Sequence, residues 1–191
     1  NWKKYGRNKE NILADTQIYL GIINYEQGEY TNAKTLLEKG LSIHKKNSSI
    51  QNEMVVRGLV FLGNVHKELG NYKKAVETLK QSLAIYKKQD DPHEILNAMA
   101  LRYLGDVYRT MGEAKEAKIL LDKSAEIYKK FFPDNDEKMG EVFVNLSKVY
   151  RDLGDYKKAK NLLKKSLRIY ETYFPENEIE IACVKIYLGN V

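Results

Sequence analysis

A chain of 191 residues with 43% hydrophobic and 30% charged side chains has the composition of one folded domain or a short repeat array, which excludes disorder of the whole chain. The net charge of +6 falls short of a concentrated basic stripe, and no apolar run approaches the ~18–20 residues that span a bilayer, so the sequence argues against a nucleic-acid module and against membrane insertion. The single cysteine excludes an internal disulfide framework and favours a reducing, cytoplasmic location.

Amphipathic segments follow one another along the chain, with apolar residues spaced by three or four positions, as on one face of a helix. Only three prolines interrupt them. In chain order these segments predict helices over residues 10–27, 30–46, 52–69, 72–89, 93–111, 114–131, 136–153, 156–173 and 177–190. The sequence therefore predicts an all-α fold.

Three series of small residues recur along the chain with the same spacing of 42 residues. The first series is Gly21, Gly63, Gly105 and Gly189, and only Ser147 breaks it. The second is Gly28, Gly70, Gly112 and Gly154, and the third is Ala33, Ala75, Ala117 and Ala159. Three coincident series at one period predict four helical hairpins followed by the first helix of a fifth.

The two glycine series have different expected roles. A glycine of the second series separates the two helices of each hairpin, where it tolerates a left-handed conformation, and the next residue, such as Asn71 or Asp155, is placed to cap the second helix. A glycine of the first series lets the partner helix approach closely. The alternative, a phosphate-binding loop, lacks the glycine cluster and the Gly-Lys-Ser/Thr sequence that such a loop needs.

The pattern Leu104-Gly105-Asp106-Val107-Tyr108, together with Gly154-Asp155-Tyr156 and Ala159, resembles the tetratricopeptide repeat. The 42-residue period and the Phe-Pro connectors at Pro133 and Pro175 resemble its kinesin-light-chain subtype. This resemblance implies a right-handed α-solenoid of antiparallel helical hairpins that binds or scaffolds proteins. We expect one array over residues 1–191, with repeats at about 12–51, 52–93, 94–135 and 136–177 and a partial fifth repeat at 178–191. The start, Asn1-Trp2-Lys3-Lys4, resembles neither a signal peptide nor an initiator end, so we expect a segment of a longer protein.

Residues that commonly carry catalysis are present but scattered. The histidines His44, His66 and His93 lie too far apart for a metal-ligand pair on one helical turn, and there is no Cys-x-x-Cys motif. The acids Asp134 and Asp136 follow a proline and suit the first turn of a helix better than an acid/base pair. The sequence therefore predicts a protein that is not an enzyme, with no catalytic residues, no cofactor and no metal site.

In the family that the chain resembles, the first helix of each hairpin lines the inner, concave face. Helical phase then selects, on each first helix, a stripe of positions that face a ligand. The large residues Tyr19, Phe61 and Tyr103 lie beside these positions. Surface variation without a ligand is the alternative explanation of the stripe. The candidate peptide-binding residues are Ile18, Ile22, Tyr25, Arg57, Val60, Phe61, Asn64, Lys67, Arg102, Tyr103, Asp106, Arg109, Asn145, Lys148 and Arg151.

The resemblance also supplies two known binding modes to compare. The residues of the chaperone-tail carboxylate clamp are absent in the expected register, and of the asparagines with which kinesin light chains hold cargo backbone only Asn145 fits. The stripes hold six cations and three acids, Asp15, Asp106 and Glu141, so we expect a peptide or protein partner with acidic groups and an apolar anchor. Glu26, Glu68 and Asp152 directly follow stripe residues and could neutralise neighbouring cations. The alternative function is a regulatory segment that gates a larger enzyme or signalling protein.

Overall fold

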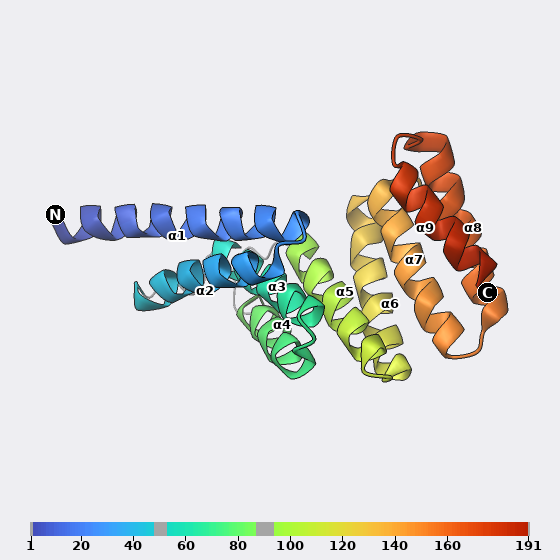
Figure 1. Cartoon of the computed structure of the whole chain (residues 1–191), viewed down its shortest axis with the longest axis horizontal. Helices are drawn as coiled ribbons and strands as arrows, with labels where there is room; N and C mark the ends of the chain where they lie inside the picture. Colours follow the sequence, from blue (N-terminus) through green and yellow to red (C-terminus); the bar gives the residue numbers. More distant parts are fainter. Residues whose placement is uncertain (1, 48–52, 87–93, 191) are drawn as a thin grey trace. The chain divides into compact units, whose positions relative to one another are not determined.

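The computed structural model describes residues 2–47, 53–86 and 94–190, with side chains described from residue 9 onwards. Within these residues the chain forms nine α-helices and no β-strand (Figure 1). The helices are α1 (Trp2–Glu26), α2 (Tyr30–Lys46), α3 (Glu53–Glu68), α4 (Tyr72–Tyr86), α5 (Glu94–Thr110), α6 (Ala114–Phe131), α7 (Glu137–Asp152), α8 (Tyr156–Tyr173) and α9 (Glu178–Gly189).

The predicted helix ends agree with these bounds to within one residue, apart from three that lie outside the described residues and the start of α1. Helix α1 begins at Trp2, whereas the prediction began it at residue 10. The repeat pattern does not reach this segment, and a helix propagates until a strong breaker stops it, which a single glycine such as Gly6 does not do. The predicted starts at 52 and 93 and the predicted end at 89 fall on residues that the structure does not describe.

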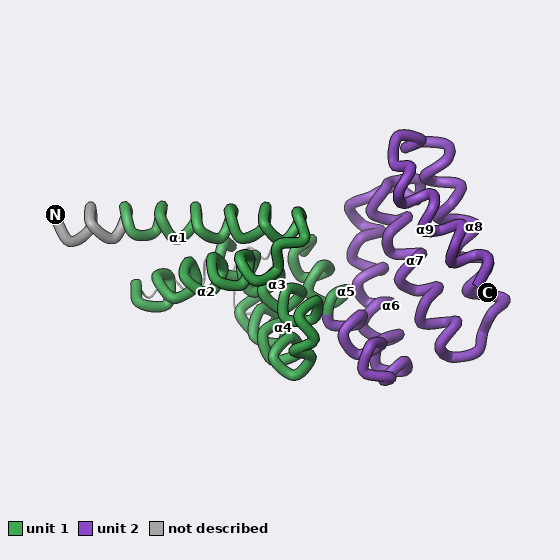
Figure 2. The backbone as a smooth tube through the Cα atoms, viewed as in Figure 1, with its two compact units in different colours: residues 1–103 green, residues 104–191 purple. Residues whose placement is uncertain are grey.

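The helices group into two compact units, Asn1–Tyr103 (unit 1) and Leu104–Val191 (unit 2) (Figure 2). The boundary falls inside α5, so the first half of this helix belongs to unit 1 and its second half to unit 2. Unit 1 also contains α1 to α4, and unit 2 contains α6 to α9. Helices of consecutive hairpins pack side by side within each unit.

The turn inside each hairpin has the same construction in all four described hairpins. Gly28, Gly70, Gly112 and Gly154 have φ angles of 78°, 75°, 85° and 80°, in the left-handed region that favours glycine. The amide that follows each glycine donates to a carbonyl five residues earlier, as when Asn71 N donates to His66 O at 2.8 Å. This is the Schellman arrangement, which satisfies carbonyls at the end of the first helix. The predicted cap at Asp155 is confirmed, because its carboxylate accepts from the Lys158 amide at 3.1 Å.

The first glycine series sits where the two helices of a hairpin cross. A Cβ atom on Gly63 would lie 2.5 Å from Leu79 Cγ, and one on Gly105 would lie 2.9 Å from Leu121 Cγ. The alanine series packs into the same layer, since Ala33, Ala75, Ala117 and Ala159 all have no exposed surface. The predicted packing role is thereby confirmed for the alanines and for Gly21, Gly63 and Gly105, whereas a Cβ atom on Gly189 would have no atom within 4 Å.

Each unit has a hydrophobic core built from consecutive hairpins. In unit 1 one cluster joins Ile18 and Ile22 of α1 to Leu37 of α2 and to Phe61 and Val65 of α3. A second cluster continues through α3, α4 and the first half of α5. In unit 2 a cluster joins α7 and α8 to Val184 of α9. The first helices of successive hairpins therefore share core contacts, and this positions the candidate binding face.

Candidate peptide-binding face

Three consecutive first helices of unit 1 bring aromatic side chains together. Tyr25 comes from α1, Phe61 from α3 and Tyr103 from α5, and we call these three residues the aromatic row. The Phe61 ring lies edge-on to both neighbours, with ring centroids 5.6 Å from Tyr25 and 6.5 Å from Tyr103. Phe61 is 8% exposed, whereas Tyr25 and Tyr103 are half-buried. The row is an ordered aromatic surface whose two ends remain accessible.

Polar groups border the aromatic row on both ends. The amide of Asn64 donates to the Tyr25 hydroxyl, and the Arg102 guanidinium lies 4.4 Å from the Tyr103 ring centroid. Burial raises the pKa of the Tyr25 hydroxyl above its ordinary value. The Oδ1 atom of Asn64 is buried and has no hydrogen-bond partner among the described residues. The row thus combines an apolar centre with hydrogen-bonding groups at its edges.

Several predicted contact residues belong to the core. Ile18 and Val60 have no exposed surface, Asn64 is 2% exposed, and Ile22 and Phe61 are also buried. Their assignment to an exposed ligand face is corrected by this burial. The reason is that helical phase treats one helix at a time, whereas the first helix of the next hairpin covers these positions. Gly58 of α3 allows this close approach, because a Cβ atom at position 58 would lie only 3.2 Å from Ile18 Cδ1, which is closer than an ordinary van der Waals contact.

The predicted cations of unit 1 are mostly compensated by acids of their own helix. Arg57 donates to Glu53 at 2.6 Å, and Lys67 pairs with Glu68 at 2.9 Å. Glu68 was expected to neutralise a neighbouring cation, and it does. Sequence reasoning missed Glu53, although its spacing of four residues before Arg57 is a known signal for a helical ion pair.

Two of the three predicted cations of unit 2, Arg109 and Arg151, are also compensated by acids. The Arg109 guanidinium lies 3.2 Å from Asp106 and 3.3 Å from Asp152, which comes from the next first helix, α7. Arg151 pairs with Asp152 at 3.1 Å. The expected neutralising role of Asp152 is therefore confirmed. The basic excess that the sequence predicts along the stripe is largely removed by these ion pairs.

The other two predicted residues of unit 2 are half-buried side chains of α7. The Lys148 ammonium lies 4.8 Å from the ring centroid of Tyr187 on α9, and Asn145 lies on the same helix as Lys148. The predicted site residues consequently fall into two sets. Residues up to Tyr103 belong to unit 1, and those from Asp106 onwards belong to unit 2. Only the unit 1 set contains an aromatic row.

Among the described residues, no group of three His, Cys, Asp or Glu side chains is arranged to hold a metal ion. No described helix is both long enough and apolar enough to cross a membrane. Sequence reasoning missed two pockets. One, of about 270 Å³, lies between the connector that follows α6 and helix α8. The other, of about 310 Å³, is lined by α2, α3 and α4.

Comparison with known protein families identifies the same repeats. Residues 12–88 and 96–172 match the tetratricopeptide repeat family. The chain belongs to the tetratricopeptide repeat (TPR) family. It is accordingly a TPR scaffold of the general protein-interaction class, and the predicted all-α solenoid class is confirmed.

Solved structures with the same fold are kinesin-light-chain-like TPR proteins. BtubC (BKLC) from P. vanneervenii has a TM-score of 0.73 and 20% sequence identity, over 85% of this chain and 65% of that chain. Two further structures are of a Podosopora anserina protein and its Q17M variant, described as a candidate kinesin light chain with nearly identical TPR-like repeats. Each has a TM-score of 0.73 and 20% sequence identity, over 95% of this chain and 85% of that chain. The TPR chain thus spans less than two thirds of BtubC. No curated protein matches it.

Proposed function

We propose that this TPR chain binds a segment of another protein on the first-helix face of unit 1, and that the accessible ends of the aromatic row, Tyr25 and Tyr103, are the main contact. The observation that carries the proposal is the edge-to-face packing of Phe61 between Tyr25 and Tyr103, which orders an accessible aromatic surface across three hairpins. The protein acts as a non-catalytic scaffold in the cytoplasm, and its partner is an extended or helical peptide segment.

Binding on this face has a low conformational cost. The Phe61 ring is held by its neighbours, so a partner side chain that packs against Tyr25 or Tyr103 orders few additional protein side chains. Aromatic residues at the centre of a contact commonly carry most of the binding free energy. We therefore assign the affinity to an aromatic or large aliphatic side chain of the partner.

Charge has a smaller part on this face. The ion pairs of Arg57 with Glu53 and of Lys67 with Glu68 leave little net positive charge for a partner to meet. Arg102, stacked on Tyr103, is the cation nearest the row and suits one carboxylate or backbone carbonyl of the partner. We expect one acidic group beside the apolar anchor and only modest weakening of binding by salt.

Peptide selection tests this proposal whatever the natural partner is. Peptides selected on the whole chain from a random displayed library are synthesised, and their affinities for wild type, Tyr103→Ala and Tyr19→Ala are measured by fluorescence anisotropy. Tyr19 is the matched control, because it lies on α1 of the same unit, is 52% exposed and is outside the row.

Loss of the Tyr103 ring should weaken binding by roughly tenfold or more, and loss of the Tyr19 ring should change it by less than about twofold. Circular dichroism confirms that both variants fold. Equal affinities for wild type and Tyr103→Ala, or an equal loss in both variants, would contradict the assignment of the face.

A further inference from the structure

The exposed face of α8 is the most basic surface among the described helices. This helix carries six cations and a single acid, Glu171, whereas α6 carries five cations and three acids. All six α8 cations are exposed on one side of the helix, and five of them form no ion pair with a described residue. We call this set the α8 basic face, and it comprises Lys157, Lys160, Lys164, Lys165 and Arg168. At 1.5 Å per residue it extends over about 17 Å.

The charge of the α8 basic face is not compensated within the described part of the chain. Its five cations form no ion pair with any described residue. The one acid of the helix, Glu171, is itself paired with Lys185 of α9 at 2.9 Å. The sixth cation, Lys158, is the exception, because it pairs with Asp155 at 3.0 Å. The first-helix stripe differs, because ion pairs neutralise most of its cations. An acidic partner, which the sequence predicts for the stripe, therefore fits the α8 basic face better.

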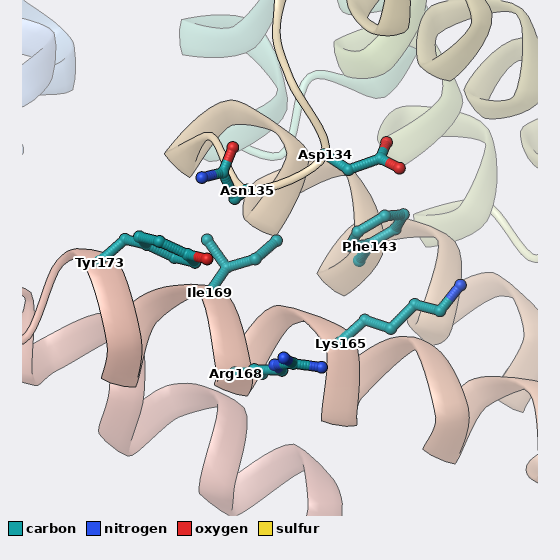
Figure 3. Close-up of a pocket in the computed structure, with 7 residues that line it drawn as sticks. All are labelled: Asp134, Asn135, Phe143, Lys165, Arg168, Ile169 and Tyr173. Atoms are coloured by element: carbon teal, nitrogen blue, oxygen red, sulfur yellow. The ribbon is translucent and has the colours of Figure 1, made fainter.

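A pocket of about 270 Å³ adjoins the C-terminal end of the α8 basic face (Figure 3). Phe143 of α7 and Ile169 and Tyr173 of α8 form its apolar walls. Lys165 and Arg168 of the basic face also line it, and the Lys165 ammonium lies 5.7 Å from the Phe143 ring centroid. The pocket is slightly smaller than the ~300–1,000 Å³ of ordinary small-molecule sites, so it suits one side chain.

The connector between α6 and α7 forms the opposite rim of the pocket. Figure 3 shows Asp134 and Asn135 of this connector across from α8. An asparagine amide can both donate to and accept from a peptide group. The Asp134 carboxylate at the rim disfavours any anionic group there, so the acidic part of a ligand lies along the α8 basic face and an uncharged part lies at the pocket. The rim therefore suits the backbone and the apolar anchor of a peptide.

We propose that the α8 basic face and this pocket form a second docking surface, which takes an acidic peptide segment with one aromatic or large aliphatic anchor residue. The anchor enters between Phe143, Ile169 and Tyr173 and supplies most of the affinity. The acidic residues lie along the α8 basic face, where they speed association and set the orientation of the peptide. This surface lies wholly in unit 2 and acts independently of the aromatic row.

The probe is a labelled peptide of glutamates with one tryptophan, compared with a version in which alanine replaces that tryptophan. Binding is measured at several salt concentrations for wild type and for Lys160→Glu/Lys164→Glu. The control, Lys39→Glu/Lys73→Glu, makes the same change in net charge at exposed lysines of unit 1. Tyr173→Ala tests the pocket, and Tyr156→Ala, another exposed tyrosine of α8, is its control. Circular dichroism checks the folding of each variant.

The α8 double variant should weaken binding of the tryptophan peptide by roughly tenfold or more and remove most of its salt dependence, while the unit 1 control changes affinity by less than about twofold. Tyr173→Ala should weaken the tryptophan peptide several-fold and leave the alanine version unchanged, and Tyr103→Ala should have no effect. An equal loss in the charge control, equal binding of both peptides, or a loss in Tyr103→Ala would overturn the proposal. Tighter, α8-dependent binding of a single-stranded oligonucleotide or of anionic lipid vesicles would also overturn it.

Discussion

Gly63 is the position where one added methyl group tests the hairpin packing most sharply. In Gly63→Ala the new Cβ atom would lie 2.5 Å from Cγ and 2.8 Å from Cδ2 of Leu79. Leu79 has no exposed surface, so its side chain has no open space into which it can move. Either α3 and α4 separate or Leu79 leaves its preferred rotamer, and both changes destabilise the hairpin.

The magnitude follows from two opposing effects. Overpacking of a core costs about 1–3 kcal/mol, and replacing a helical glycine by alanine returns about 0.5–1 kcal/mol. The expected net loss is about 0.5–2 kcal/mol in the free energy of unfolding. For a chain of this size, this lowers the melting temperature by about 1–8 °C.

Gly189→Ala is the matched control, because Gly189 occupies the same repeat position and a Cβ atom there would have no atom within 4 Å. Its melting temperature should stay the same or rise slightly. Both variants are melted thermally and in urea, with helicity followed by circular dichroism. In a Leu79→Ala background, Gly63→Ala should cost less than in wild type, since the opposing atoms are gone. A Gly63→Ala protein as stable as wild type would refute the packing role of this glycine series.

Three further predictions concern other parts of the repeat. Ala117→Phe should lower the free energy of unfolding by about 1–3 kcal/mol in urea melts, because Ala117 has no exposed surface. Ala114→Phe is the control, since Ala114 is half-buried and other repeats carry tyrosine at this position, and its effect should stay within ~0.5 kcal/mol. Gly112→Ala should cost about 1–2 kcal/mol because Gly112 has a φ of 85°, and an unchanged melting temperature would contradict this. Burial lowers the pKa of His66, so its stabilising contribution is complete above about pH 6.5 and is lost as pH falls through the lowered pKa, with a slope of at most ~1.4 kcal/mol per pH unit. His66→Tyr should remove this part of the pH dependence, and urea melts at neutral and mildly acidic pH that fall in parallel for both proteins would disprove it.

The hairpins were predictable because their sequence signals act locally. A left-handed turn requires glycine wherever it occurs, so Gly28 and Gly70 mark the same backbone event one period apart, and their φ angles confirm it. The Gly63 series was equally informative, because close helix crossing excludes a side chain. Helix bounds followed from these two series and from the apolar spacing.

Exposure and charge compensation were less predictable, because they depend on neighbouring helices. Ile18 and Val60 have the helical phase of a ligand-facing position, yet the adjacent first helix buries both. Arg109 is compensated by Asp152, which is 43 residues away in the chain. The α8 basic face was missed because helical phase was applied only to the first helix of each hairpin, whereas Lys160 and Lys164 lie on a second helix.

The most direct test of the central claim is a map of where a bound peptide lies. A library-selected peptide carries a photoreactive benzophenone at its anchor position, is cross-linked to the whole chain, and the adducts are located by mass spectrometry. We expect adducts on α1, α3 and the first half of α5, next to Tyr25 and Tyr103, and their loss when unlabelled peptide competes. Adducts confined to α2 and α4, or to unit 2, would contradict the proposal that the aromatic row of unit 1 holds the partner.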